Sequence, residues 1–596
     1  MHNVRFVRAA IVPLSAIAAV ALAADEIHWT LTGPTSVTFD WRGADSTIQY
    51  GPTDEYGYTV TGVPPDPMPA SSSGPFWEAR ITGLEPGAVY HYSIEGEADH
   101  TFRTAPEPSQ NFVVCVEGDI GAADHYAPVP AIQGAIAKDD PWFVLMVGDL
   151  TYADDFGPEA VDRHFNDVMT WAREAAYMPA WGNHEWNPPD DMSNYKGRFD
   201  LPNPQASPNA PLEGCCGEDW YWFDCGNVRF IAYPEPYPRA WADWAPRARV
   251  LMDEAQADPA IRFIVTFGHR PAFSSGYHPG DAGLRGFLGS LGATHGKYVL
   301  NLNGHSHNYE RSVAQSGVVH VTAGIGGSSL EQAPPPCAWT GGCPAPAWSA
   351  FRAFHHGALR LRFGRTSIRG TAICGPPSTG SGGVDDIACA PGEVFDAFTI
   401  GEDLPPQPSA PDTVTAGEGT LLRAAVHAED PDGDPIEALT ADLSALPPGN
   451  DAAFEADSGG GTGTLDWIPR PEDAGTWPVT FRAQNEVAGT TTTMLRVLPP
   501  PPIPAPGPFG LTLSSVGPNP ATSSFRVNYS LESWAPARLE LVDVAGRLRA
   551  RRDLGAPGPG PHEGVLDRPN RARPGLYRLR LVQAGRSVST GVVLLR

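Results

Sequence analysis

Four segments between residues 25 and 104 alternate hydrophobic and polar side chains, and turn residues separate them: 36–39, 46–50, 77–81 and 89–94. Alternation with a period of two is typical of strands that bury one face. Turn signals about every 8–12 residues are typical of a small β-sandwich. We therefore expect a sandwich over residues 24–105.

Residues 106–400 have a different pattern, in which continuous apolar runs alternate with segments of helical period. The apolar runs are 112–118, 142–147, 178–181, 262–267 and 298–302, and the expected helices are 130–138, 159–174, 247–257 and 283–291. Fully apolar strands separated by helices are typical of an α/β domain with helices covering its sheets. We expect one such domain here, an α/β sandwich.

The last third of the chain returns to short alternating strands in two modules. Residues 405–498 are acidic and resemble a cadherin- or Ig-like module, and the run Asp-Pro-Asp-Gly-Asp at 430–434 could bind calcium or form an acidic turn. A proline-rich linker covers 499–508. Residues 509–596 carry 13 arginines against 6 acidic residues from residue 511 onward, and they resemble Ig-like sorting domains of type IX secretion.

Residues 1–23 have the pattern of a secretory signal peptide. Arg5 and Arg8 precede an apolar run over 9–20, and Ala-Leu-Ala at 21–23 matches the cleavage pattern. The apolar run is shorter than the roughly 20 residues that span a bilayer. We expect bacterial-type export to a secreted or cell-surface location, with no transmembrane segment.

The charge of the chain limits the classes of binding partner, and its cysteines bear on disulfide formation. The 596 residues include 68 acidic and 41 basic side chains, a formal net charge of −27. Nucleic-acid binding is not expected, because it needs a basic surface. Export permits disulfides among the eight cysteines. Short spacing favours Cys337 with Cys343, Cys374 with Cys389, and Cys225 with Cys215 or Cys216, and Cys115 lies in an apolar run as a free thiol.

Each of the five apolar runs of the central domain ends in a short turn with polar, ligand-competent side chains. Because the carboxyl ends of neighbouring strands face one crevice, these turns are expected to build a single site. One such turn is weak evidence, since a lone aspartate often caps a helix. Five in succession favour a metal site. They are Gly118-Asp119-Ile-Gly121, Gly148-Asp149-Leu-Thr-Tyr152, Gly182-Asn183-His184-Glu185, Gly268-His269 and Gly304-His305-Ser-His307.

This set of turns resembles the motifs of the calcineurin-like metallophosphoesterases, and within them the purple acid phosphatases. The segments 148–154 (GDLTYAD) and 304–311 (GHSHNYER) are especially similar to the plant-type enzymes. The sequence L-x-P-G-x-x-Y-x-Y at 84–92 resembles a fibronectin type III repeat, which fits the N-terminal domain of that family. The resemblance covers roughly residues 25–400.

The resemblance implies a dinuclear metal centre. Many relatives have Asp-x-His as the first motif, but Gly121 replaces that histidine here, and Tyr152 is the expected substitute ligand. The hard, anionic donors of the first site suit Fe(III), and the mixed donors of the second suit Zn, Mn or Fe(II). The implied first site is Asp119, Asp149, Tyr152 and His307, and the second is Asn183, His269 and His305 with Asp149 shared.

The implied activity is hydrolysis of phosphate monoesters by a metal-bound hydroxide. His184 and His278 are the candidate catalytic residues, as substrate contacts and acids for the leaving alcohol, and Glu185 is expected to orient a ligand. The family's purple colour comes from charge transfer between tyrosinate and iron, which would involve Tyr152.

Two other functions remain open from the sequence. The same metal site would also suit a phosphodiesterase or nucleotide pyrophosphatase, and the loops 187–216 and 328–347 would set that choice. The additional β-modules also allow a surface adhesion or scaffold protein with an inactive phosphoesterase domain. The expected partners are phosphorylated small-molecule or exported substrates, and the C-terminal module is expected to engage the secretion machinery or the cell surface.

Overall fold

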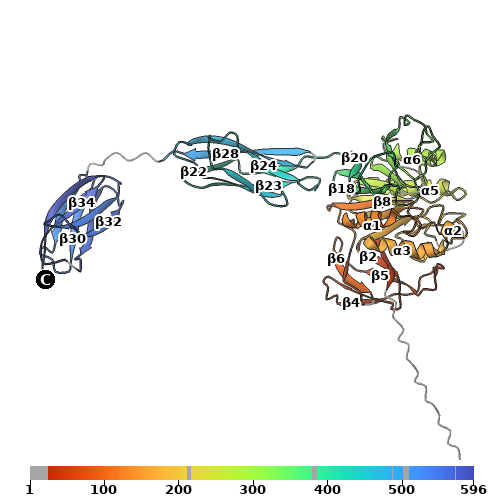
Figure 1. The fold of residues 1–596 in the computed structure, drawn as a ribbon, viewed down its shortest axis with the longest axis horizontal. Helices are drawn as coiled ribbons and strands as arrows, with labels where there is room; N and C mark the ends of the chain where they lie inside the picture. Colours follow the sequence, from red (N-terminus) through yellow and green to blue (C-terminus); the bar gives the residue numbers. More distant parts are fainter. Residues whose placement is uncertain are drawn as a thin grey trace, which may run out of the picture.

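The structure, a computed structural model, describes residues 24–94, 96–210, 217–378, 385–485, 487–500, 509–570 and 572–596. The predicted signal peptide and most of the predicted linker lie outside the described residues. The chain forms an N-terminal β-sandwich, a central α/β domain and two C-terminal Ig-like β-sandwiches, which confirms the predicted fold class (Figure 1). Among the described helices, none is both long and apolar enough to cross a membrane.

The N-terminal sandwich closes around an aromatic core that includes Trp29, Phe39, Tyr92 and Phe102. The alternating segments of the sequence lie in its strands, because the alternation turns one face of each strand toward this core. One sheet has the order β1 (Asp25–Gly33), β2 (Ser36–Arg42), β5 (Phe76–Thr82), and the other β4 (Tyr58–Thr61), β3 (Thr47–Gly51), β6 (Val89–Ile94), β7 (His100–Arg103).

The central domain contains two sheets in which the strands before the polar turns run parallel. The first has the order β10 (Ala176–Ala180), β9 (Phe143–Val147), β8 (Phe112–Glu117), β18 (Gly357–Phe363), β19 (Ser367–Cys374), β20 (Val394–Gly401). The second has the order β11 (Trp222–Cys225), β12 (Val228–Ala232), β13 (Phe263–Phe267), β14 (Tyr298–Asn303), β16 (Val319–Ala323), β15 (Tyr309–Ser312), β17 (Ser349–Ala353).

Among the helices of the central domain, α3 packs against α1 and α2, and α5 packs against α6 (Figure 1). The sequence predicts a helix over 247–257, yet α5 begins at Ala240 and contains Pro246. Burial of Ala240 and Trp244 stabilises the first turns in spite of the missing backbone donor. The helices are α1 (Val129–Lys138), α2 (Ala153–Phe156), α3 (Glu159–Ala172), α4 (Ser193–Lys196), α5 (Ala240–Ala257) and α6 (Ala282–Gly292).

The N-terminal sandwich and the central domain share a buried ionic contact. Strand β1 packs against α3 and β10. The Arg198 guanidinium lies 2.9 Å from Glu26 Oε2 and 2.9 Å from Asp162 Oδ1, and its side chain is only 2% exposed. Removing one partner of a buried pair leaves an uncompensated charge, so the two domains are expected to behave as one unit.

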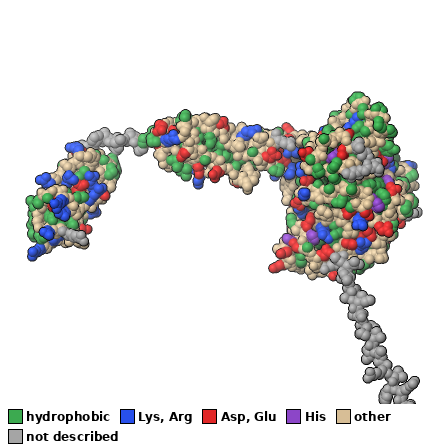
Figure 2. All heavy atoms as spheres, in the orientation of Figure 1, with side chains coloured by type: hydrophobic (Ala, Val, Ile, Leu, Met, Phe, Trp, Pro, Cys, Tyr) green, Lys and Arg blue, Asp and Glu red, His purple; other side chains and the backbone are tan. Residues whose placement is uncertain are grey.

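Each C-terminal module is a sandwich of two sheets with its own core. Figure 2 shows Lys and Arg side chains gathered on the last module, as its arginine content predicts. The middle module pairs β21 (Gln407–Ser409), β23 (Leu422–Glu429), β26 (Thr462–Trp467), β25 (Ala453–Ala456) with β22 (Thr413–Gly417), β28 (Ala488–Leu498), β27 (Gly475–Gln484), β24 (Ala438–Asp442). The last pairs β29 (Thr512–Gly517), β30 (Ser524–Leu531), β33 (Gly560–Asp567) with β32 (Leu548–Gly555), β31 (Ala537–Asp543), β34 (Gly575–Gln583), β35 (Arg586–Leu594).

The acidic loop 430–434 joins the middle module to the central domain. The Asp432 side chain is fully buried, and it accepts hydrogen bonds from Thr366 Oγ1 and from the backbone N–H of Leu404 (2.6 Å). Its backbone carbonyl accepts a hydrogen bond from Asn111 Nδ2 (2.6 Å). The loop therefore forms a contact between the middle module and the central domain. Calcium binding by this loop stays a prediction, which the contacts of Asp432 do not favour.

We predict that Asp432→Ala weakens this contact between the middle module and the central domain. The substitution leaves the half-buried Leu404 N–H without its acceptor, which costs about 1–3 kcal/mol of stability, and it also removes the hydrogen bond from the Thr366 hydroxyl. Scanning calorimetry should show a lower transition temperature for the variant. Asp412→Ala removes an exposed acid of the same module and should leave the transition temperature unchanged. Equal transition temperatures of the two variants would contradict a stabilising role of Asp432 at this contact.

The cysteines follow the sequence prediction in part. Cys337–Cys343 and Cys374–Cys389 form disulfides, and Cys115 is a buried free thiol, as predicted. Cys225 is also a buried free thiol at the end of β11, so its predicted pairing is wrong. The partners proposed for it, Cys215 and Cys216, lie outside the described residues.

Candidate metal centre

The carboxyl ends of β8, β9, β13 and β14 bring the polar turns together where the two central sheets meet. Asp119, Asp149 and His305 follow their strands with positive φ angles of 58°, 52° and 65°. Non-glycine residues rarely adopt this left-handed conformation, and such strain concentrates at functional sites. The backbone thus turns sharply at the positions whose side chains the sequence assigns to metal binding.

Two glycines of the motifs are required by close approach. A Cβ atom on Gly182 would lie 2.1 Å from Asp149 Oδ1, and one on Gly304 would lie 2.4 Å from Asp119 Oδ2. Any side chain at either position would displace a carboxylate. The glycines of the GNHE and GHSH motifs therefore keep room for the acidic ligands of the neighbouring strands.

The first group of ligand-type side chains comprises Asp119, Asp149 and His307. Potential ligand atoms of these three residues lie within 4.8 Å of one another, and all three are buried. His307 Nε2 lies 3.2 Å from Asp119 Oδ1 and 3.0 Å from the Tyr152 hydroxyl. The structure thus brings together the four residues that the sequence assigned to the first site.

The second group comprises Asp149, His269 and His305, again within 4.8 Å and buried. His269 Nε2 lies 3.0 Å from Asp149 Oδ2. A cavity opens at these side chains, and Asn183 lines it together with Asp149 and His305. Asp149 belongs to both groups, as a ligand shared by two cations must.

Two histidines are held with Nε2 toward this centre. His269 Nδ1 donates to the Val147 carbonyl (2.9 Å), and His307 Nδ1 donates to the Ser329 carbonyl (2.7 Å). A carbonyl can only accept, so Nδ1 carries a proton in both rings and Nε2 is the nitrogen that would bind a cation. His305 differs, because Arg270 donates to its Nε2 (2.5 Å), and a cation there would take the lone pair that Arg270 uses.

The polar atoms fit a bound cation pair. Asp119 Oδ1 and Asn183 Oδ1 are buried and accept no hydrogen bond from the described residues. Buried acceptors are almost always satisfied, so an unsatisfied pair beside three histidines indicates a missing positive partner. Carboxylate, amide and imidazole donors are ligands of iron, zinc and manganese.

The electrostatics agree with an anionic centre that needs cations. Burial alone would raise the pKa of Asp149, but His269 beside it lowers that pKa below its usual range. Burial raises the pKa of Tyr152 well above its usual value, and Asp119 and Asp149 raise it further. Tyr152 is therefore a neutral phenol in the absence of a cation, and strong positive charge is needed to make it a phenolate.

Of the two predicted catalytic histidines, His184 has the firmer support. Its Nδ1 lies 2.7 Å from Asp154 Oδ1, and its backbone N–H donates to Asp149 Oδ1 (3.0 Å). Burial lowers the pKa of His184. The hydrogen bond with Asp154 and the charges of nearby acids outweigh burial and raise the pKa to about 9. Its ring lies against Tyr152, with 4.3 Å between centroids. His184 is therefore held as a cation at the wall of the cavity.

His278 and Glu185 occupy different positions. His278 lines the cavity, stacks on His305 at 4.2 Å and lies 3.0 Å from Glu331 Oε2. Glu185 is buried behind the site, where its carboxylate accepts from the backbone N–H groups of Asp149 (3.0 Å), Leu150 (2.7 Å) and Gly182 (2.6 Å). Glu185 thus joins two ligand-bearing turns through their backbones.

Several cavity residues were absent from the sequence prediction. The cavity has a volume of about 270 Å³, and Tyr126, Asp155, Ser329 and Glu331 line it together with predicted residues. Asp154, which holds His184, stands at the end of the GDLTYAD segment and offered a signal in the sequence. Tyr126 and Glu331 come from loops without a recognisable motif.

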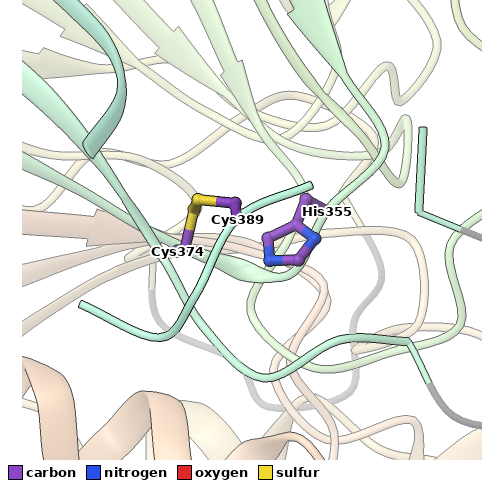
Figure 3. A group of neighbouring side chains, drawn as sticks. All are labelled: His355, Cys374 and Cys389. Carbon is purple, nitrogen blue, oxygen red and sulfur yellow. A yellow bond between two sulfur atoms is a disulfide. The ribbon is translucent and has the colours of Figure 1, made fainter. Parts of the chain in front are cut away.

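A third cluster lies apart from this centre and contains His355 with Cys374 and Cys389 (Figure 3). The two sulfurs form a disulfide, so neither is a thiolate ligand. His355 Nδ1 lies 2.9 Å from Asp385 Oδ1. In the oxidised state this cluster is a covalent link beside a hydrogen bond between His355 and Asp385, and not a metal site.

Comparison with known proteins agrees with this centre. Residues 112–309 match the family model described as calcineurin-like phosphoesterase. Purple acid phosphatase 23 of Arabidopsis thaliana is 26% identical over 317 residues, which are 44% of this chain and 65% of that protein. Probable inactive purple acid phosphatase 27 of the same plant is 24% identical over 387 residues, 54% of this chain and 60% of that protein.

The matched regions thus span less than two thirds of these two relatives. Among solved structures, "Structure of PhoD" aligns at 12% identity over 63% of this chain and 89% of that chain, with a TM-score of 0.43. The family match and the two overlapping ligand groups coincide on the same strands. The central domain is therefore a calcineurin-like metallophosphoesterase domain with distant homology to the purple acid phosphatases.

Proposed function

We propose that this protein is an exported phosphatase that hydrolyses phosphate monoesters at a dinuclear metal centre. The observation that carries the proposal is Asp149, which is shared by two buried groups of ligand side chains at one wall of the cavity. Two cations that share a ligand are the usual arrangement for stabilising the attacking and leaving oxygens in an in-line displacement at phosphorus. The relatives' names divide between a phosphatase and a probable inactive one, so activity has to be tested directly.

The donors favour different metals at the two positions. Asp119, Asp149 and the Tyr152 phenol oxygen are hard donors that suit Fe(III), and the Asn183 and histidine donors suit Zn, Mn or Fe(II). Cations bound there would supply Lewis acidity, which lowers the pKa of water and neutralises phosphoryl charge. Every other part of the reaction is assigned to side chains of the chain itself.

His184 is the proposed acid for the leaving alcohol. It lines the cavity as an imidazolium, with Nδ1 occupied by Asp154 and Nε2 left to face the substrate. A proton donor of this kind contributes about 10²–10⁴-fold to rate. His278, paired with Glu331, is the proposed second contact to the phosphoryl oxygens.

We predict that Asp154→Asn slows turnover by roughly 10–100-fold, the usual effect of losing a residue that orients a catalytic group. The amide can no longer hold His184 as a cation, so the loss should grow with the pKa of the leaving alcohol. Steady-state rates on p-nitrophenyl phosphate and on an alkyl phosphate measure this. Asp154→Glu should restore part of the rate, and an equal loss on both substrates would contradict an acid role for His184.

The same site would also suit diesters, which makes a phosphodiesterase or nucleotide pyrophosphatase the second candidate. Parallel assays on p-nitrophenyl phosphate and bis(p-nitrophenyl) phosphate separate the two. Faster hydrolysis of the monoester supports the proposal, and activity restricted to the diester overturns it. An adhesion or scaffold role without catalysis would require that neither ester is hydrolysed by protein that carries its metals.

Export and surface attachment complete the proposal. The signal-peptide pattern of residues 1–23 supports export, and the disulfide Cys374–Cys389 is of the kind that persists outside the cytoplasm. The arginine-rich last module supports contact with secretion machinery or an anionic cell surface (Figure 2). Fractionation of cells that express the chain with and without residues 509–596 tests this role.

A further inference from the structure

We propose that the cavity selects phosphate monoesters whose alcohol carries a cationic amine or quaternary ammonium group. The inference rests on the proposed phosphatase function and extends it from reaction to substrate class. It is carried by three features of the cavity lining: a carboxylate without a lysine or arginine partner, an aromatic ring in the same lining, and a second carboxylate.

Asp155 supplies the first carboxylate. A potential ligand oxygen of Asp155 lies within 4.8 Å of those of Asp154 and His184, and Asp155 lines the cavity. Asp154 is already engaged by His184, whereas no lysine or arginine of the described residues pairs with Asp155. Asp155 is exposed, so its charge is accessible to a group that enters the cavity.

Tyr126 supplies the aromatic surface of the cavity, and Phe156 packs beside it outside the lining. Tyr126 lines the cavity, with its ring 5.6 Å from that of Tyr152 and 5.7 Å from that of Phe156. Phe156 is 39% exposed and stacks on His125 at 3.9 Å. Aromatic faces next to a carboxylate attract alkylammonium groups through cation–π contact.

Gly121 makes this surface possible. Its φ is +81°, and a Cβ atom there would lie 2.2 Å from Tyr126 Cδ2. A histidine at this position, as in many relatives, would drive the Tyr126 ring away. The residue that departs from the wider superfamily's first motif therefore also gives the cavity its aromatic wall.

Glu331 adds a second carboxylate to the cavity lining, 3.0 Å from His278. Among the described residues that line the cavity there is no lysine or arginine. Polyphosphates and sugar bisphosphates would bring additional negative charge toward Asp155 and Glu331. The wall thus disfavours polyanionic substrates and favours a cationic leaving group.

Phosphocholine and its neutral isostere 3,3-dimethylbutyl phosphate test the inference, because they differ in charge and hardly in shape. We expect the purified, metal-loaded enzyme to show a kcat/KM on the order of tenfold higher for phosphocholine. Asp155→Asn and Tyr126→Leu should each bring this ratio close to one. Asp124→Asn, an exposed acid of the same region outside the cavity lining, should keep the wild-type ratio.

A wild-type ratio of one, with both esters hydrolysed, would overturn the substrate class and leave the phosphatase function standing. A ratio that survives both cavity variants would overturn the assigned residues. Failure to hydrolyse both esters and p-nitrophenyl phosphate would overturn the phosphatase function and the inference with it. Turnover of p-nitrophenyl phosphate by each variant reports that the metal centre is intact.

Discussion

Asp149→Asn is expected to abolish nearly all turnover, by on the order of 10³-fold or more. Asp149 is the one carboxylate common to both ligand groups, and His269 keeps it ionised. An asparagine occupies the same volume but has no charge to neutralise two cations, so both metal positions are weakened at once. The rate on p-nitrophenyl phosphate and the metal content of the same sample measure the effect.

Metal content distinguishes a ligand from a merely structural residue. We expect less than one metal ion per chain in Asp149→Asn, with an unchanged circular dichroism spectrum. Glu159→Gln, which alters an exposed acid in the first turn of α3, should retain wild-type metal and rate. Wild-type turnover by Asp149→Asn would remove this residue from the site.

Tyr152→Phe is expected to eliminate the broad visible absorption band of an iron-loaded protein. The Tyr152 hydroxyl lies 3.0 Å from His307 Nε2, and burial with Asp119 and Asp149 raises its pKa so far that only a strong cation would make it a phenolate. Phenylalanine keeps the ring and its packing on His184 but removes the donor oxygen. The charge-transfer band depends on that oxygen alone.

The visible spectrum of the purified protein gives the answer, with Tyr126→Phe as the matched control. The Tyr126 ring centroid lies 5.6 Å from that of Tyr152, and Tyr126 belongs to neither ligand group. The Tyr126→Phe variant should therefore keep the visible band. A band that survives in Tyr152→Phe would exclude Tyr152 as a ligand. A wild-type protein that contains iron but shows no band would also contradict the assignment.

The sequence predicted the metal-binding part of the cavity because strand ends and ligands share one local pattern. Asp119, Asp149 and His269 each follow an apolar strand within a few residues, and parallel strands place such residues at one edge. A single pattern therefore identified residues that are more than a hundred positions apart.

The other residues of the cavity lining could not be predicted one by one. Tyr126 and Glu331 stand on irregular loops, and although the sequence indicated the loop 328–347, the position of each side chain depends on how Gly121 and the segment after β16 pack. The run 430–434 allowed either a calcium loop or an acidic turn, and the sequence could not predict the protein donors that the Asp432 carboxylate meets in the fold. Cys225 was paired by proximity in sequence, while burial at the end of β11 keeps it as a free thiol.

Metal content and hydrolysis measured on one sample, before and after chelation, test the dinuclear phosphatase most directly. We predict two metal ions per chain, one of them iron, with p-nitrophenyl phosphate turnover that disappears on chelation and returns when metal is restored. Turnover that persists in metal-free protein, or fully metal-loaded protein that hydrolyses no phosphate ester, would contradict the account.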